Sequence, residues 1–542
     1  MNLGAALTRR WLSLPPRRCA VRRRLEWVAL TDGVRLATQV LLPQDGARPW
    51  PAVLMRTSEP SHRPGHAAAS LGRLIAESGF AVVLQECRGR HASEGRFAPF
   101  LNEAADGGDA IAWIASQEWF DGRLGLLGWG YSGFAAWAAL SRSPRPVAAL
   151  VAAFAARDPF AWLRPGGALA LELALRWGVG VGEREAEDPG RLDLERGLSH
   201  RPLREADRVT LKRVDWFREW IEHPARDAYW EARSPALPEA PPPTLLIAGW
   251  RHPALAAQLA DLPALREAAR RRGAPEPELV IGPWPGGQPP RREARRTRSR
   301  AGAESLRAAL DFLARRLRGE PAARAPVRVF MRGASVWREA SAWPLPNARS
   351  LALHLRGGGR ANGRTGDGAL LREAPPGEEP ADRYSYDPRD PALADDPATE
   401  CRHDVLCYTT EPLPEPLLIG GPVGAVLFAE SSAAVTDFTA TLVALAPDGK
   451  QQTLCDGVLR SRGAPGETRR LELDLGAACA RLETGGRLRL RVSSSAFPRW
   501  DRPSHTEVEP GAAAESEIAP ARQTVFHDRE RPSHLRLSLL ES

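Results

Sequence analysis

Short apolar runs separated by turn residues dominate the chain, and in its first half they alternate with helical patterns. The strand-length runs at 79–86 (GFAVVLQE) and 123–129 (RLGLLGW) flank an amphipathic helical segment at 102–117. The same alternation returns with the apolar runs at 244–250 (TLLIAGW) and 278–284 (ELVIGPW). Strands that alternate with helices predict a parallel sheet with both faces covered.

Two further features frame this α/β pattern. Asp32-Gly33 joins two strand-like runs, WVAL and VRLATQVLL, as the turn of a β-hairpin does. Residues 155–237 are mostly helical, with three aromatic side chains at helical spacing between 216 and 220. The segment predicts an insertion of the kind that forms lids over α/β active sites, although packing alone would produce the same stripe.

Helical patterns stop near residue 325. Strand-like runs such as VRVFMR, DFTATLVALA and LRLRVSSS follow, separated by Gly, Pro and Asp turns, and they predict a β-sandwich or jelly roll. We therefore divide the chain into a basic, disordered N-terminal extension at 1–25, an α/β domain at 26–154 and 238–325, a helical cap at 155–237, and a jelly-roll domain at 326–542.

Composition places the chain among globular proteins. Its 542 residues are enough for two or three domains, and 43% of them are hydrophobic and 26% charged. No stretch approaches 18 uninterrupted apolar residues, so we expect no membrane span. The six scattered cysteines argue against a disulfide scaffold and suit a reducing compartment, and we expect a cytoplasmic protein.

The basic charge is concentrated at one end of the chain. The formal net charge is +8, but residues 1–25 carry seven arginines and no acidic residue, so the remainder is nearly neutral. Lys212 and Lys450 are the only lysines, which indicates GC-rich coding rather than a nucleic-acid surface. Arg9-Arg10 begins a twin-arginine pattern that lacks the apolar core of such a signal. We expect no nucleic-acid partner and no membrane partner.

Several strings in order resemble one protein family. They are ECRGRHASEGRF (86–97), NEAADGGDAIAWIASQEWFDGRLGLLGWGYSG (102–133), LLIAGW (245–250), IGPW (281–284), VFMRGASVWREASAWPLP (329–346) and TDFTATLVALAPDG (436–449). They are similar to the CocE/NonD family of serine hydrolases, which includes bacterial cocaine esterases, α-amino-acid ester hydrolases and X-Pro dipeptidyl-peptidase-like proteins. The resemblance covers nearly everything from residue 27 onward. It implies an α/β-hydrolase domain with a helical cap and a C-terminal jelly roll of the X-Pro dipeptidyl-peptidase C-terminal type.

The resemblance also implies a Ser-His-Asp triad that hydrolyses esters or amides without any cofactor. The serine of the family stands on a tight strand-to-helix elbow, in the string Gly-x-Ser-Tyr-x-Gly. Here the string at 128–133 reads GWGYSG, so the nucleophile position holds Gly130, which has no side chain.

The other positions of the implied site differ as well. The acid of the family follows a Gly-Trp pair, and here that place is taken by His252. The base lies in Gly-Pro-Trp-x-His, and here Gly286 stands in place of the histidine. The oxyanion-hole tyrosine ends an Arg-Thr-Pro-Tyr-like string, and here Glu59 stands there, where a carboxylate would repel a developing oxyanion. Without nucleophile and base no acyl-enzyme forms by the family route.

We interpret the chain as a pseudohydrolase that keeps the scaffold. The backbone of Tyr131 stands at the remaining oxyanion-equivalent position, and Trp129, Trp250 and Trp284 are expected to line a surviving pocket. Such a pocket would bind a small acyl or peptide-like ligand, or the jelly roll would hold a partner. Family members often self-associate, so a homo-oligomer is left open.

The alternative is an active esterase or amidase with a rewired site. Read from Gly130, the string Gly-Tyr-Ser-Gly-Phe resembles Gly-x-Ser-x-Gly, with Ser132 as the substitute nucleophile and Phe134 where a small residue is needed. His252 and Glu59 would then serve as base and orienting group. The simpler interpretation is that Ser132 supplies a small residue after the elbow.

The remaining candidate residues have simpler explanations. Cys401, His403 and Cys407 offer only three ligands at a spacing unlike a zinc knuckle, so we expect no metal site. Cys87 is expected to be buried and inert.

Loop residues complete the set of candidates. The apolar run at 51–56 (PAVLMR) predicts another buried strand, and His62 and His66, in the loop after it, are expected to be solvated. The arginine-rich run at 291–300 is expected to be an exposed loop entering a helix, which an anionic partner could use.

Overall fold

The computed structural model describes residues 9, 14, 16–45, 48–61, 66–182, 193–210, 213–284, 291–321 and 324–541, with only the backbone described over 291–302. The chain divides into two compact units. The first comprises 1–159, 181–187 and 227–328, and the second comprises 160–180, 188–226 and 329–542.

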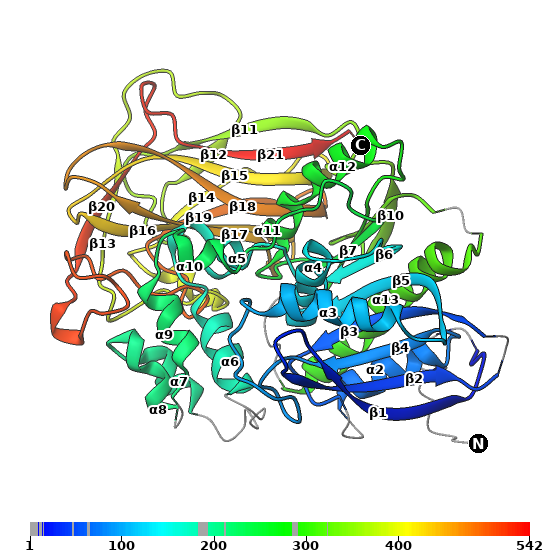
Figure 1. Cartoon of the computed structure of the whole chain (residues 1–542). Coiled ribbons are helices and arrows are strands. Elements are labelled where there is room, and N and C mark those ends of the chain that lie inside the picture. The colour runs from blue at the N-terminus through cyan, green and yellow to red at the C-terminus, as the bar shows by residue number, and fades with distance from the viewer. Residues whose placement is uncertain are drawn as a thin grey trace. The chain divides into compact units, whose positions relative to one another are not determined.

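A mixed sheet with a parallel centre forms the core of the first unit (Figure 1). Its first eight strands in spatial order are β1 (Val21–Ala29), β2 (Arg35–Pro43), β4 (Ala81–Glu86), β3 (Trp50–Thr57), β5 (Phe120–Trp129), β6 (Ala149–Ala153), β7 (Thr244–Gly249) and β8 (Glu278–Gly282). β2 runs antiparallel to β4, whereas neighbours from β4 to β8 are parallel. Every residue of β3 and β4 is buried, as expected for strands covered on both faces.

The helices of this unit are α2 (Ala67–Ala76), α3 (Glu103–Ala115), α4 (Tyr131–Ser141), α10 (Ala228–Glu231), α11 (Leu255–Ala260), α12 (Leu262–Arg271) and α13 (Arg291–Arg318). A Cβ on Gly125 of β5 would lie 2.9 Å from Leu313 of α13, whereas one on Gly128 would meet the backbone of Ser132 in α4. Positions 125 and 128 point to opposite faces of a strand. The predicted parallel sheet with helices on both faces is therefore confirmed.

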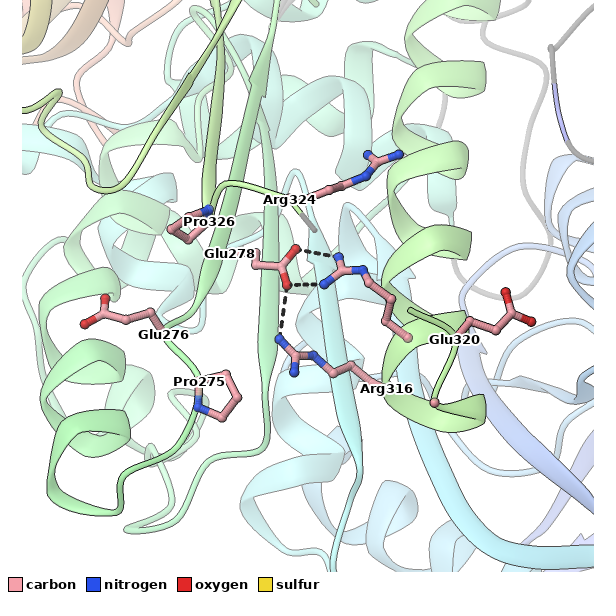
Figure 2. Close-up of a pocket in the computed structure, with 9 residues that line it drawn as sticks. Pro275, Glu276, Glu278, Arg316, Glu320, Arg324 and Pro326 are labelled. Carbon is pink, nitrogen blue, oxygen red and sulfur yellow. Dashed lines mark hydrogen bonds and ion pairs between the residues drawn. The ribbon is translucent and has the colours of Figure 1, made fainter. Parts of the chain in front are cut away.

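The C-terminal end of α13 is fixed to β8 by ion pairs (Figure 2). Arg315 donates two hydrogen bonds of 2.7 Å to the carboxylate of Glu278, and Arg316 adds one of 3.1 Å. They border a surface hollow of about 510 Å³ that Arg324 and Glu320 also line. Because Arg315 and Arg316 both bind Glu278, we assign this cluster a structural role.

Strands dominate the second unit. They include β11 (Arg349–Arg356), β12 (Ala369–Leu371), β13 (Asp382–Tyr386), β14 (Leu406–Thr409), β15 (Leu417–Ser431), β16 (Val435–Leu445), β17 (Gln451–Arg462), β18 (Arg469–Leu482), β19 (Arg487–Ser493), β20 (Ala521–Phe526) and β21 (His534–Leu540). Two short strands precede them, β9 (Val327–Met331) and β10 (Val336–Ala340). Alternate apolar side chains of these strands, such as Leu471, Leu473 and Leu475 of β18, form one buried core.

The helical insertion groups with the second unit. Its helices are α5 (Pro159–Leu163), α6 (Leu171–Val181), α7 (Leu194–Ser199), α8 (Ala206–Val209) and α9 (Asp215–Glu222), with 3-10 turns at Pro165–Gly167 and Leu203–Glu205. Trp216, Phe217 and Trp220 are buried on α9, as their spacing predicts. Gly166 has its Cα against the Val458 carbonyl of β17, where a Cβ would lie 1.8 Å from the oxygen. No helix of the described residues is long and apolar enough to span a membrane.

The basic extension at 1–25 was predicted to be disordered, and this is wrong for residues 21–25, which form part of a strand. β1 begins at Val21 and pairs antiparallel with β2 from Val21↔Pro43 to Ala29↔Arg35, so the predicted hairpin is longer than expected. Arg9 is buried and forms an ion pair of 3.4 Å with Glu77. A run of arginines is compatible with an edge strand, because alternate side chains and the long guanidinium stems reach solvent.

Candidate functional site

The turn between β5 and α4 has the geometry of a nucleophile elbow. Gly130 lies between the strand and the helix with φ 55° and ψ −125°. Its N–H donates to the carbonyl of Ala153 on β6 at 2.8 Å, and its own carbonyl accepts from Gly133 at 2.9 Å and Phe134 at 3.1 Å. These three bonds fix the chain reversal at the carboxyl end of the central strands.

Close backbone contacts explain the glycines on either side of this elbow. A Cβ on Gly128 would lie 2.1 Å from the carbonyl carbon of Ser132, and one on Gly133 would lie 2.8 Å from Cβ of Ala155. A Cβ on Gly130, by contrast, would meet no atom of the described residues within 4 Å. The elbow therefore keeps the room for a nucleophilic side chain but carries none.

Ser132 lies in the first turn of α4, two residues past the elbow. Its side chain is half-buried, and its carbonyl packs against Gly128. Within the described residues no hydrogen bond joins its hydroxyl to His252 or to Glu59. The described residues therefore show no hydrogen-bonded arrangement of Ser132, His252 and Glu59.

His252 stands at the position of the family's acid, in the turn that leads from β7 to α11. It follows β7 through Arg251, which has φ 66°. The N–H of Ala254 donates to Nδ1 of His252 at 3.2 Å, so this nitrogen carries no proton. The ring lies 5.3 Å from that of Phe154, measured between centroids. An imidazole in this place offers no carboxylate for orienting a catalytic base.

The aromatic residues expected to line a pocket are largely core residues. Trp250 and Trp284 are each 3% exposed. A Cβ on Gly282 would lie 2.4 Å from the indole of Trp284, and one on Gly249 would lie 2.6 Å from its carbonyl oxygen. Trp284 therefore packs against the carboxyl ends of β7 and β8. Trp129 is half-buried and donates from Nε1 to Ser305 at 3.3 Å.

Gly286, at the position of the base, and His62 lie outside the described residues. Glu59 is exposed, and its N–H donates to Oγ1 of Thr57 at 3.0 Å. Neighbouring atoms that displace water raise the pKa of its carboxyl, and the exposed His66 opposes that shift.

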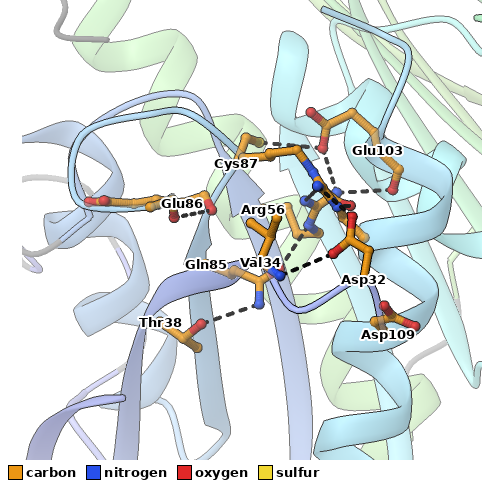
Figure 3. Close-up of polar contacts among 12 residues, drawn as sticks. Asp32, Val34, Thr38, Arg56, Gln85, Glu86, Cys87, Glu103 and Asp109 are labelled. Atoms are coloured by element: carbon orange, nitrogen blue, oxygen red, sulfur yellow. Dashed lines mark hydrogen bonds and ion pairs between the residues drawn. The ribbon is translucent and has the colours of Figure 1, made fainter. Parts of the chain in front are cut away.

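A buried polar network around Arg56 and Glu103 was not singled out from the sequence (Figure 3). The guanidinium of Arg56 pairs with Glu103 and, at 3.4 Å, with Asp106. The phenol of Tyr131 donates to Oε1 of Glu103 at 2.8 Å. Burial opposes the charge on Arg56, but the two carboxylates outweigh it and raise the pKa of the guanidinium. The string at 102–133 supplies Glu103, Asp106 and Tyr131, and its acidic residues were the available signal.

The remaining candidates show no catalytic arrangement. Cys87 is fully buried, and its thiol donates to Glu103 at 3.4 Å. Burial is the largest of the effects that raise the pKa of this thiol well above its usual value. Cys401 is exposed and Cys407 is buried. Across the described parts of the chain no group of three metal-binding side chains occurs. The exposed loop predicted at 291–300 is wrong, because these residues belong to helix α13. Their side chains lie outside the described part of the structure.

Two family models match the chain along most of its length. Residues 32–287 match the X-Pro dipeptidyl-peptidase (S15 family) model, and residues 322–536 match the X-Pro dipeptidyl-peptidase C-terminal non-catalytic domain. The chain is 33% identical to the cocaine esterase of Rhodococcus sp. (strain MB1 Bresler), over 95% of this chain and 98% of the esterase.

Solved structures show the same fold. An aminopeptidase from a marine sediment archaeon, Thaumarchaeota archaeon, superposes with a TM-score of 0.80 at 21% identity, over 97% of this chain and 98% of the aminopeptidase. An α-amino acid ester hydrolase superposes with a TM-score of 0.79 at 23% identity, over the same shares of both chains. The predicted combination of an α/β-hydrolase domain and a C-terminal β domain is confirmed.

Proposed function

The chain belongs to the CocE/NonD family of hydrolases, and we propose that it is a member without the family's catalytic triad, which keeps the scaffold for binding. The observation that carries this proposal is the elbow at Gly130. Its backbone has the strained shape that presents a nucleophile, and open space lies where the side chain would stand, yet a glycine occupies it. Acyl transfer by the family route needs an oxygen nucleophile at that point.

The state of His252 supports the same proposal. Its Nδ1 accepts from the N–H of Ala254 in the turn before α11, and an imidazole offers no carboxylate that could orient a base. The position of Ser132 in the first turn of α4 does not favour it as a substitute nucleophile, because the backbone there lacks the elbow conformation.

The ligand class follows from the relatives. The names of the cocaine esterase, the aminopeptidase and the α-amino acid ester hydrolase all refer to hydrolysis of esters or amides. We extend this only to binding, and propose a small acyl or peptide-like molecule as the ligand.

The six free cysteines agree with a cytoplasmic location.

Labelling with a fluorophosphonate probe of serine hydrolases tests the loss of the nucleophile. An active esterase of the family serves as the positive control. We expect the control to be labelled and this protein to remain unlabelled. Labelling that disappears in Ser132→Ala would overturn the proposal and establish the rewired esterase.

A gain-of-function variant separates a missing triad from a changed scaffold. The triple variant Gly130→Ser, His252→Asp, Gly286→His should be labelled by the probe, because the elbow and its flanking glycines are in place. The matched control replaces Gly130 with alanine in the same background and should stay unlabelled. Labelling confined to the serine variant would show that only the triad was lost.

A further inference from the structure

A cavity of about 120 Å³ lies within the second unit, where the helical insertion meets the β domain. A single water molecule needs a cavity of about 10–15 Å³, so this one has room for a molecule of several heavy atoms. Apolar residues form much of its wall, namely Leu169, Leu203, Ile221, Pro224, Pro510 and Ala512. None of the described residues that line it belongs to the elbow at Gly130 or to the positions of the family's triad.

Arg164 also lines this cavity, with a guanidinium that is only partly partnered. The residue is 5% exposed. Its Nη2 donates to the carbonyls of Trp220 and, at 3.3 Å, of Ile221 in the last turn of α9. Among the described residues Nε and Nη1 have no acceptor, and no carboxylate lies within ion-pair distance. Buried charges in proteins are normally paired, so a cation in this place favours an anionic ligand.

The buried acid closest in charge to Arg164 is already engaged. Asp501 pairs with Arg460 at 2.9 Å and accepts from the N–H of Leu169 at 2.7 Å. Burial lowers the pKa of the Arg164 guanidinium to about 10, and Asp501 only partly opposes this shift. Glu509, another acid of the cavity wall, pairs with Arg462 at 2.9 Å. The two acids therefore leave the free donors of Arg164 without a carboxylate.

The buried charges around Asp501 add up to a positive surplus. The group comprises Arg164, Arg201, Arg460, Arg502, Asp437 and Asp501. Both aspartates pair with Arg460. The hydrogen bonds that Arg201 and Arg502 donate go to backbone carbonyls. Four guanidinium groups thus face two carboxylates, and burial together with the neighbouring Arg502 lowers the pKa of Arg201 to about 10.

The two remaining charged residues of the wall do not remove this surplus. Arg204 and Glu222 are both exposed and carry one charge of each sign. The cavity therefore combines an apolar wall with a buried, partly partnered guanidinium in a region of positive charge. A ligand that matches it has an anionic head and a small apolar body.

We propose that this cavity binds a short-chain carboxylate, whose head pairs with Arg164 and whose alkyl chain contacts the apolar wall. A guanidinium is the side chain that best matches the geometry of a carboxylate. The apolar wall favours an aliphatic acid over phosphate, which offers no apolar surface. The site is separate from the pocket proposed for the acyl ligand, and it does not depend on whether the protein is catalytically active.

Titration calorimetry with sodium butyrate tests the binding. Sodium chloride keeps the ionic strength constant, so that screening of surface charges does not change during the titration. We expect saturable binding of butyrate. Butyramide, which has nearly the same shape without the charge, and inorganic phosphate should each bind at least about tenfold more weakly. Absence of butyrate binding, or equal affinity for butyrate and either comparison molecule, would overturn the proposal.

Variants locate the bound butyrate. Arg164→Met removes the charge and should weaken binding at least about tenfold. Arg208→Met is the matched control, because Arg208 is an exposed residue of α8 that does not line the cavity, and its variant should bind like the original protein. If Arg164→Met binds butyrate as tightly as the control, Arg164 is not the partner and the proposal fails.

A second variant tests the cavity without removing a charge, since Arg164→Met also loses two bonds to α9. Ala512→Leu places a larger side chain in the cavity wall and should abolish butyrate binding. Ala514→Leu, two residues further and outside the wall, should leave binding unchanged. Circular dichroism verifies that each variant is folded, and Ala512→Leu decides if Arg164→Met is not. Unchanged affinity in a folded Ala512→Leu variant would assign the butyrate to another site.

Discussion

The phenol of Tyr131 donates a hydrogen bond of 2.8 Å to Oε1 of Glu103 and so ties the residue after the elbow to the first turn of α3. The same phenol accepts from the N–H of Phe100 at 3.1 Å. Glu103 in turn pairs with Arg56 on β3. This buried network therefore holds the elbow in place, although Gly130 at the elbow carries no side chain.

Removing the hydroxyl should therefore destabilise the protein. Tyr131→Phe leaves Glu103 and the N–H of Phe100 each short of a partner in a buried site, and we expect a loss of about 1–3 kcal/mol in the free energy of unfolding. Urea denaturation followed by fluorescence measures it. Ser141→Ala is the control, because that hydroxyl only returns to Ala138 in its own helix and its removal should cost less than about 0.5 kcal/mol. Equal stability of the two variants would contradict a structural role for the network.

A side chain at the elbow should impose strain even though it has room. Gly130 has φ 55°, and a Cβ there meets nothing within 4 Å, so Gly130→Ala tests backbone strain without a clash. We expect a loss of about 1–3 kcal/mol. Gly180 of α6 is a matched control, since its φ is ordinary and a Cβ there also meets no atom within 4 Å. Gly180→Ala should be neutral or stabilising by up to about 1 kcal/mol. A Gly130→Ala variant as stable as the original protein would show that the elbow is not strained.

The sequence alone predicted those strands and turns whose local residue pattern matches their place in the folded protein. The buried runs of β3 and β4 and the turn at Asp32-Gly33 follow from apolar periodicity and turn chemistry. The spacing of Gly128 and Gly133 reflects direct backbone contact, so the elbow could be located from the string alone.

Other features depend on neighbours that no local pattern specifies. Charge at 21–25 favoured disorder, but pairing with β2 makes these residues a strand. Trp284 was expected beside a ligand, because aromatic side chains serve pockets and cores alike, and only the packing of Gly249 and Gly282 against it reveals a core residue. His252 was identified by position, whereas its bond from Ala254 depends on the local turn.

A buried neutral histidine should make the β domain less stable in acid. His505 is 7% exposed, bonded through Nδ1 to the carbonyl of Ala519 at 2.8 Å and through Nε2 to Thr436 at 3.1 Å. Burial lowers the pKa of His505 to about 4. The unfolded chain takes up a proton near pH 6.5 and the folded protein only near pH 4. Stability should therefore fall by up to about 3 kcal/mol as the pH falls through this window.

Unfolding measured at several pH values checks this slope. His505→Asn should flatten the pH dependence between about pH 6.5 and 4, because the titrating group is gone. Asparagine is chosen because position 505 has φ 62°, which it tolerates better than most residues. An unchanged slope in the variant would assign the acid sensitivity to other groups.

His527 should act in the opposite direction. Its Nε2 lies 2.9 Å from the buried carboxylate of Asp382, and its Nδ1 lies 3.2 Å from Glu379. Burial opposes the charged ring, but these two carboxylates outweigh it and raise the pKa of His527. A charged imidazole donates to both. Because the folded pKa is above the unfolded value, the stability that it contributes is complete below about pH 6.5 and is lost as the pH rises through the folded pKa.

The pH dependence of a substitution isolates this contribution. His527→Gln can donate to only one carboxylate at a time and carries no charge, so it should destabilise the protein more at pH 5.5 than at pH 9. His403→Gln, at an exposed position, should change stability by less than about 0.5 kcal/mol. Urea unfolding of the three proteins at pH 5.5, 7.5 and 9 gives the comparison. A difference between the original protein and His527→Gln that is constant, or that grows toward pH 9, would mean that the ring is neutral between its two acids.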